Sequence, residues 1–600
     1  KWTLGNGTVG TKASLYQYGG TFDFAGNDLG ANLDGQNSYF YAGVLLNSAS
    51  STSKVWTQNV NIPGNVTVST PNVGGDIDLT KPAYIFGNAS VYTLTKTGAG
   101  DLHLRSSYLS STTDFNINVQ AGNLWYDVNS RTAISYAGIY TLALGSKLYL
   151  NQDSAVTIPG VITGAGSVVV RTSTTLSGNN TYTGGTTVLN NATLTQGVAA
   201  VMSGDTIVSS AIGTGTITLG DATIRGAYSL GSYATLANNV VINGAATIFS
   251  AANSTISGLI SDGSNTGQGL TFSSGASTTV QVAGNNTYTG TTTISAGTLK
   301  LGSATALGTG AVSVTSGAAL DLNGQTMTST GGLTLNGTGI SSGGALINSS
   351  ATGATYAGLV TLGSATSIVG GTGSISLSNT GTISGAYALT LGGTAGGSIA
   401  SIVGTSNGTL TKQGAGTWTL NGVNTFTGAT TISAGTLVIG GAGSLNSGSY
   451  AGAIANNGTF QYSSSAAQTL SGIISGTGLL TKDTSATSIL TLSGANTYSG
   501  GSNFNSGTVS LGHASALGST GALSFGGGTL QFTASNTTDY SARFSAAANQ
   551  MYSLDTNAQN VTLASGIASS GASLTKLGTG TLTLSGANTY SGTTTISAGT

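Results

Sequence analysis

Of the two histidines in the sequence, His103 alone has neighbours suited to acid–base chemistry. It lies in the segment DLHLR at residues 101–105. In a β-strand the two leucines face the interior, so Asp101, His103 and Arg105 share the outward face. A carboxylate beside an imidazole can act as a general acid–base couple. The corresponding segment TWTLN at residues 417–421 carries threonine in place of the histidine, which favours a structural row over a catalytic one.

The pair Asp76 and Asp78 is the second candidate for chemistry. Two aspartates separated by one residue lie on the same face of a strand, about 7 Å apart. Such a pair could catalyse glycoside hydrolysis or bind calcium. Gly74-Gly75 precedes the pair and Lys81-Pro82 follows it. These neighbours indicate a solvated edge, so we favour a structural interpretation of both carboxylates.

The remaining motifs are explained by composition. G-x-S-x-G occurs at residues 339–343 and 404–408, and G-x-G-x-x-G occurs at residues 5–10. No helix follows the serines, as a nucleophile elbow requires, and no βαβ unit surrounds the glycines. His513 lies in a turn, and the chain has no cysteine. We therefore predict no catalytic residue, no cofactor and no metal site.

The composition excludes several classes of protein. The chain of 600 residues has 96 glycines, 15 basic and 16 acidic residues, a net charge of −1 and a mean hydropathy of +0.19. Such a balance cannot neutralise phosphates along a groove, which excludes a nucleic-acid partner. The hydropathy argues against disorder, and no apolar run reaches the ~20 residues of a transmembrane helix.

A recurring module sets the architecture. The segment LTKLGTGTLTLSGANTYSGTTTISAGT at residues 574–600 returns at 410–440 and 480–512, in half copies at 176–194 and 282–302, and in degenerate form at 94–105. Within the module apolar residues alternate with threonine, which predicts half-buried strands separated by glycine and asparagine corners. The segments between the predicted strands are too short to form helices. The pattern predicts an all-β fold, a parallel β-helix of stacked coils, in preference to several β-sandwich domains.

The module also predicts which side chains are structural. The predicted core residues are Trp418, Leu420, Ile432, Leu437, Leu582, Leu584 and Ile596. The predicted corner aromatics are Tyr182, Tyr288, Phe426, Tyr498 and Tyr590. Lysines that precede a glycine turn, at positions 96, 412, 482 and 576, are predicted to be exposed edge charges.

The charged residues and tryptophans concentrate in residues 1–155, which hold nine of the 16 acidic and eight of the 15 basic residues. We predict that residues 1–155 form irregular coils, a cap or a head. Residues 156–600 are predicted to form a repeat-bearing stalk that continues beyond Thr600.

The module resembles the autotransporter-associated β-strand repeat, also called the passenger-associated transport repeat. The segments LGSATALG at residues 301–308 and LGHASALG at 511–518 resemble the extension that follows this repeat. The resemblance implies a right-handed β-helix in a secreted bacterial surface protein, and a repeat associated with export. It implies no catalytic residue, and any membrane anchor lies outside this sequence.

These observations predict a non-enzymatic, extracellular, adhesive or structural rod on a bacterial surface. Its expected partners are further copies of itself, glycans, or host or neighbouring cell surfaces. Two alternatives remain open. One is a subunit of a self-assembling filament, sheath or surface layer, and the other is a polysaccharide-acting β-helix enzyme that uses Asp76 and Asp78.

Overall fold

The computed structural model describes residues 2–3, 16–23, 37–49, 54–56, 59–79, 83–84, 91–105, 115–127, 138–204, 206–226, 234–328 and 331–600. The chain forms two compact units. The first comprises Lys1–Thr293 with Thr305–Gly310, and the second comprises Ile294–Ala304 with Ala311–Thr600. The predicted division after residue 155 falls inside the first unit and stays a prediction.

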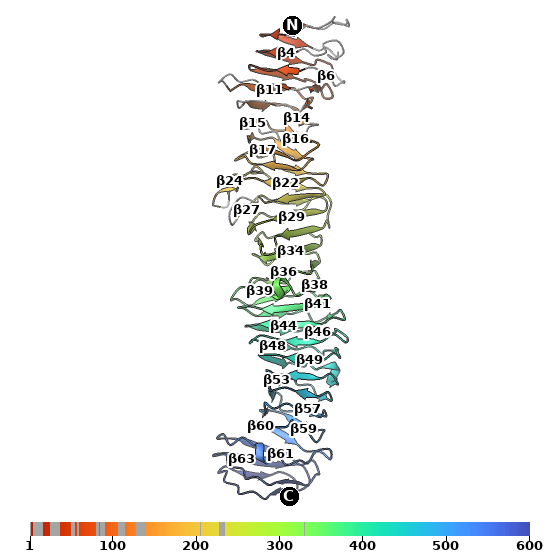
Figure 1. Ribbon diagram of the computed structural model, residues 1–600, viewed down its shortest axis with the longest axis vertical. Coiled ribbons are helices and arrows are strands. Elements are labelled where there is room, and N and C mark those ends of the chain that lie inside the picture. The colour runs from red at the N-terminus through yellow and green to blue at the C-terminus, as the bar shows by residue number, and fades with distance from the viewer. Residues whose placement is uncertain are drawn as a thin grey trace. The chain divides into compact units, whose positions relative to one another are not determined.

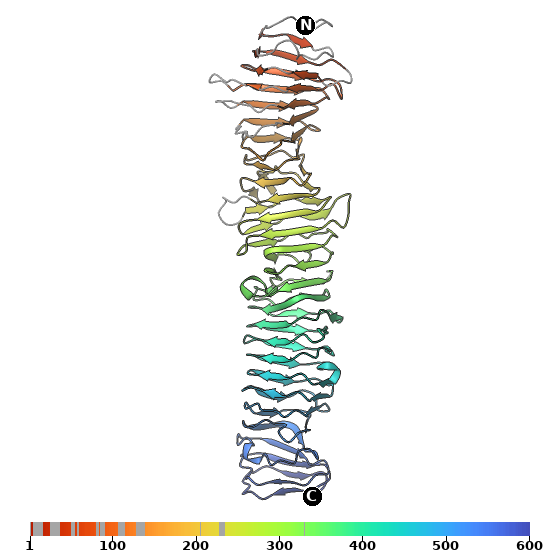
Figure 2. The ribbon, with the colours of Figure 1, turned by 45° about the vertical axis from the view of Figure 1, so that its right-hand side comes forward.

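Nearly every regular element of the described chain is a β-strand, as the alternating pattern predicts. Three short 3-10 turns are the exceptions, at Ile340–Ser342, Asn446–Gly448 and Ser541–Arg543. Apart from one antiparallel hairpin at residues 201–209, the described strands pair in parallel with strands of the preceding and following coils (Figure 1, Figure 2). The predicted fold class, an all-β parallel β-helix, is confirmed. No helix in the described residues is long and apolar enough to span a membrane.

In the first unit, a ten-stranded parallel sheet carries the residues that the sequence singles out for chemistry. Successive strands of this sheet are β9 (Ile77–Leu79), β12 (Leu102–Leu104), β14 (Asn123–Tyr126), β16 (Lys147–Leu150) and β19 (Ser167–Val170). Leu102 pairs with Ile77 on one side and with Leu124 on the other. Because the register is kept from coil to coil, residues one coil apart form columns across the sheet.

The second unit repeats this arrangement. One parallel sheet contains β44 (Leu389–Gly393), β47 (Leu410–Lys412) and β49 (Thr430–Ile432). Another contains β45 (Gly396–Ile399), β48 (Thr417–Leu420) and β50 (Thr436–Ile439).

Side chains alternate between the interior and the surface along these strands. In β48, Trp418 and Leu420 are fully buried while Thr417 and Thr419 face outward. The Trp418 indole N–H donates to the carbonyl of Gly392 at 2.9 Å. Gly397 pairs with Trp418, and a Cβ at this glycine would lie 2.9 Å from the indole ring. The glycine therefore provides the space that the tryptophan fills.

The predicted core residues differ in burial according to their coil. Ile432 and Leu437 are fully buried, like Trp418 and Leu420, whereas Leu582 and Leu584 are half-buried. Ile596 is 63% exposed and lies on the last strand, so its predicted place in the core stays a prediction. Its strand β65 (Thr594–Ile596) pairs, among the described residues, only with β63 (Ser573–Leu577). A core side chain in a solenoid is covered by the coils on both sides of it, and the structure describes one of the two coils beside Ile596.

Candidate functional site

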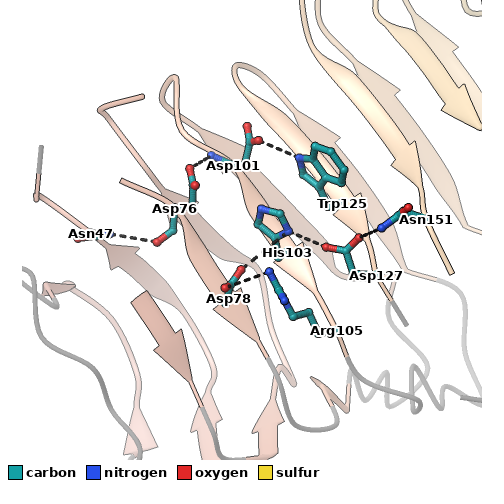
Figure 3. Close-up of polar contacts among 9 residues, drawn as sticks. All are labelled: Asn47, Asp76, Asp78, Asp101, His103, Arg105, Trp125, Asp127 and Asn151. Carbon is teal, nitrogen blue, oxygen red and sulfur yellow. Dashed lines mark hydrogen bonds and ion pairs between the residues drawn. The ribbon is translucent and has the colours of Figure 1, made fainter. Parts of the chain in front are cut away.

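The outward face of β9, β12, β14 and β16 carries a cluster of polar and aromatic side chains (Figure 3). The register places Asp78, His103, Trp125 and Tyr149 in one column. Asp76, Asp101 and Asn123 form the column on one side, and Arg105, Asp127 and Asn151 form the column on the other.

His103 lies between two carboxylates. Its Nδ1 donates to Oδ2 of Asp127 at 2.7 Å and lies 3.8 Å from Oδ1 of Asp78. Arg105 contacts Oδ2 of Asp78 at 3.3 Å. The side chains of His103, Asp78 and Asp127 are only 10–15% exposed, while that of Arg105 is 44% exposed. The structure therefore brings together Asp78 and His103, the two candidates for chemistry.

The two carboxyl groups beside His103 differ in acidity. Burial raises the pKa of Asp78, although the charges of His103 and Arg105 oppose this effect. Burial also acts to raise the pKa of Asp127, but hydrogen bonds from His103 and Asn151 outweigh it and hold the pKa below its usual value. Carboxyl groups with divergent pKa values can serve as acid and base. This is the strongest chemical feature of the described residues.

The hydrogen bonds of the cluster, however, connect coils to one another. Asp127 accepts at both oxygens, from His103 and, at 2.8 Å, from the amide of Asn151. Asp101 accepts from the backbone N–H and side-chain amide of Asn123 and, at 2.8 Å, from the indole N–H of Trp125. The partners of these two carboxylates thus lie in neighbouring coils of the sheet, and each bond connects one coil to the following coil.

The aromatic rings of the central column are stacked along the coils. His103 and Trp125 lie 5.3 Å apart with an interplanar angle of 14°, and Trp125 and Tyr149 lie 3.7 Å apart at 1°. Both faces of the indole are therefore covered by neighbouring rings. A sugar that stacks on tryptophan needs an open face, so this column is built for cohesion between coils.

The sequence pattern located part of this cluster. Leu102 and Leu104 are buried and His103 faces outward, as predicted. Asp127 and Trp125 were not singled out. Asp127 and Trp125 are separated from His103 by one coil along the chain. Identifying them from the sequence requires the number of residues in that coil.

The other motifs show no catalytic arrangement. Nδ1 of His513 accepts from the backbone N–H of Ser515. Ser341 and Ser406 lie in left-handed turns, with φ of 48° and 53°, and neither opens an α-helix. Among the described residues, no group of three or more histidines and acidic residues could hold a metal. Residues 5–10 and Lys81-Pro82 lie outside the described residues.

The repeat asparagine connects three coils. Oδ1 of Asn496 accepts from the backbone N–H of Ile474 at 2.8 Å in the preceding coil, and its amide donates to the carbonyl of Ala516 at 2.7 Å in the following coil. Asn286 makes the same contacts with Ile260 and Ala306. Both asparagines are buried. Sequence reasoning placed this residue in a turn and missed its role as a bridge.

The corner aromatics lie beside these asparagines. Tyr182, Tyr288, Phe426 and Tyr498 are fully buried, and Tyr590 is half-buried. Each tyrosine hydroxyl bonds the hydroxyl four residues later, as between Tyr498 and Ser502 at 2.7 Å. Phe426 lacks the hydroxyl, and Tyr450 of the next coil bonds Thr430 instead, at 2.9 Å.

The prediction that the repeat lysines are exposed is wrong. Lys96, Lys412, Lys482 and Lys576 are at most 2% exposed. Nζ of Lys412 donates to three carbonyls, those of Gln413 at 3.0 Å, Gly414 at 2.7 Å and Ala434 at 3.0 Å. A buried ammonium is tolerated when its donors are satisfied. The alternation already placed Lys412 inward, because Leu410 is buried and Thr411 faces outward.

A glycine of the next coil closes over each of these lysines. Gly435 has φ of 66°, and a Cβ on it would lie 2.7 Å from Nζ of Lys412. Gly122, Gly507 and Gly599 stand in the same relation to Lys96, Lys482 and Lys576. The lysine of one coil and the glycine of the next coil therefore form one contact between coils.

Comparison with known families agrees with this structural role. Five segments match the passenger-associated transport repeat, at residues 173–195, 262–301, 410–439, 487–511 and 574–600. No curated protein and no solved structure matches the chain. The chain thus carries the repeats of autotransporter passenger domains on a β-solenoid, and the resemblance seen in the sequence is confirmed.

Proposed function

We propose that this chain is a structural, non-enzymatic part of a secreted bacterial surface protein, and that it associates with further copies of itself. The repeats support the surface location, because they are those of autotransporter passengers. The polar groups of the module support the structural role, because they are engaged between coils.

The observation that carries self-association is an uncharged stretch in the second unit. From Leu322 to Thr481, the only charged residue is Lys412. Lys412 is fully buried. Residues 322–481 therefore present a surface without a charged side chain, which we call the neutral face.

Hydroxyl groups form columns on the neutral face. Thr390, Thr411 and Thr431 lie on β44, β47 and β49 in register. Ser398 and Thr419 pair in the same way on β45 and β48. These five side chains are half-buried and face outward. Each hydroxyl can donate and accept, so the face is complementary to a second copy of itself.

Electrostatics favours this partner. Exposed charge keeps proteins monomeric by repulsion between copies, and surfaces without it associate. A strongly charged partner gains nothing from the neutral face. Contacts made through it depend little on salt, because there are no ionic interactions to screen.

Introducing charge on the neutral face tests the proposal. The variant Thr390→Lys/Thr431→Lys places like charges on both copies, and we expect concentration-dependent association in sedimentation and light scattering to be lost. Thr141→Lys/Thr163→Lys is the matched control, because these paired outward threonines lie on β15 (Ile139–Leu142) and β18 (Val161–Gly164) of the first unit. A wild-type protein that stays monomeric contradicts the proposal.

Micrographs of the wild-type protein distinguish two forms of self-association. Irregular or pairwise contacts support an adhesive passenger. Ordered arrays support a subunit of a filament, sheath or surface layer.

The cluster around His103 is the observation that favours a second candidate, a polysaccharide-acting enzyme. Turnover of a glycan by the wild-type chain, lost in Asp76→Asn/Asp78→Asn, would establish that activity. We expect no turnover in either protein.

A further inference from the structure

A hairpin interrupts the regular coils of the first unit. It consists of β23 (Val201–Ser203) and β24 (Thr206–Ser209), which pair antiparallel, whereas the coil strands pair in parallel. In Figure 1, β24 lies at the edge of the solenoid, outside the stacked strands. Insertions into repeat proteins commonly form the binding face.

A hollow of about 440 Å³ lies beside the hairpin. One wall is formed by Thr206 and Ile207 of β24, and the rest is formed by residues 214–216 and 237–239 of two coils. Pockets for small ligands have volumes of roughly 300–1,000 Å³, so the hollow can accept one or two sugar rings.

The coil side of the hollow is held in a fixed conformation. Asn238 is buried and donates its amide hydrogens to the carbonyls of Gly213 at 3.1 Å and Gly215 at 2.8 Å. At the base of the hairpin, the Ser210 hydroxyl donates to the carbonyl of Gly213 at 2.6 Å and accepts from the N–H of Ile212. The site is thus organised before a ligand arrives, which reduces the entropic cost of binding.

The chemistry of the lining selects the class of ligand. Among the described residues that line the hollow, none is charged or aromatic. These described residues therefore offer no ion pair to a phosphate, carboxylate or amine, and no ring on which a nucleobase can stack. They offer the hydroxyls of Thr206 and Thr216 and the side-chain amide nitrogen of Asn239, for which the described structure shows no hydrogen bond. Ile207 and Ala237 add apolar contacts.

We propose that this hollow binds a neutral carbohydrate. Sugar hydroxyls both donate and accept hydrogen bonds, as threonine hydroxyls do, and sugar C–H groups pack on small apolar side chains. The site is separate from the neutral face of the second unit, and the inference does not depend on self-association.

The test uses the full chain on an array of neutral and acidic oligosaccharides, followed by saturation-transfer NMR with the best neutral oligosaccharide. Two variants remove ligand groups with little change of shape. Thr216→Val removes a hydroxyl, and Asn239→Asp removes the amide donor while keeping the oxygen that accepts from the Leu259 N–H. Thr355→Val is the matched control, on an outward position of β40 (Ala354–Tyr356) in the second unit.

We expect the wild-type chain and Thr355→Val to bind neutral oligosaccharides, and each hollow variant to bind about tenfold more weakly, the effect of one lost hydrogen bond. Circular dichroism of each variant verifies the fold. The proposal is overturned if no neutral oligosaccharide binds, if only acidic ones bind, or if both hollow variants bind like the wild type. Light scattering on the same samples reports self-association separately.

Discussion

The ammonium of Lys412 donates a hydrogen bond of 3.0 Å to the carbonyl oxygen of Ala434, one coil further along the chain. Its other two bonds go to Gln413 and Gly414 in its own turn. Since Lys412 is fully buried, no solvent replaces these partners. The contact connects the coil of β47 to the coil of β49, and it recurs between Lys96 and Ala121 and between Lys576 and Ala598.

Replacing Lys412 by methionine should loosen these coils. Lys412→Met keeps the length of the side chain but leaves buried carbonyls without a donor, which costs about 1–3 kcal/mol for each unsatisfied group. Because stability in a solenoid is largely local, amide hydrogen exchange in β47 and β49 should accelerate. Lys147→Met, at an exposed lysine, is the control and should leave amide hydrogen exchange in β47 and β49 unchanged. Equal protection of β47 and β49 in both variants would contradict the role assigned to Lys412.

The buried lysines should make stability depend on pH in the mildly alkaline range. Burial lowers the pKa of Lys96 and of Lys412 to about 8, whereas a lysine in an unfolded chain has a pKa of about 10.4. Between these values the unfolded chain binds more protons, so the contribution of these lysines to the unfolding free energy rises with pH. Urea unfolding at pH 8 and pH 10 should show the wild type gaining stability relative to Lys412→Met. A relative loss would show that the sign is wrong.

At higher pH the buried tyrosines should reverse this trend. Burial raises the pKa of Tyr182, Tyr288 and Tyr498 above the usual value near 10, and their hydrogen bonds offset this effect only in part. The unfolded chain then loses protons that the folded chain retains, so stability falls as the pH rises above about 10. Tyrosinate absorbance and circular dichroism should change together in one transition. Ionisation of these tyrosines in a chain that keeps its β-structure would contradict this prediction.

The corner hydroxyls provide a matched pair of substitutions. Tyr498→Phe leaves the Ser502 hydroxyl without this partner and should cost about 0.5–1.5 kcal/mol. Phe426→Tyr would introduce a hydroxyl where Tyr450 already bonds Thr430, and we expect no gain in stability. Thermal unfolding of both variants measures the difference. A stabilising Phe426→Tyr would show that Tyr450 is not a substitute for the missing hydroxyl.

The cluster around His103 should respond to loss of Asp127 as a structural unit. Asp127→Ala removes the acceptor of His103 and of Asn151, which should destabilise these coils by about 1–3 kcal/mol. The stacked His103 and Trp125 rings should become less ordered. Tryptophan fluorescence should then be quenched more strongly by a quencher added to the solution. Asp153→Ala is the control, at an exposed aspartate. Unchanged quenching and stability in Asp127→Ala would argue for a role other than cohesion.

The sequence was sufficient for those features that depend on local alternation. Leu102 and Leu104 are buried and His103 faces outward because successive strand residues point to opposite sides. Trp418 and Leu420 follow the same rule. Such features need only the residues of one strand.

Contacts between coils were less predictable, because they depend on the number of residues in each coil. Asp127 meets His103 only because β14 pairs with β12 in a particular register. The burial of Lys412 depends on the Ala434–Gly435 turn of the next coil. The alternation along the strand indicates that Lys412 points inward, but the prediction of an exposed lysine followed the general tendency of lysine to lie on the surface.

The glycine that covers each repeat lysine always lies later in the chain than the lysine. Because of this order, adding coils toward the C-terminus differs from adding them toward the N-terminus. When coils are added toward the C-terminus, the newest lysine keeps a hydrated cation at the growing end until the following glycine turn arrives. Dehydration of that cation then coincides with the formation of its last hydrogen bond. Growth in the opposite direction places the carbonyl of the turn first, and each incoming lysine must lose its water as it docks.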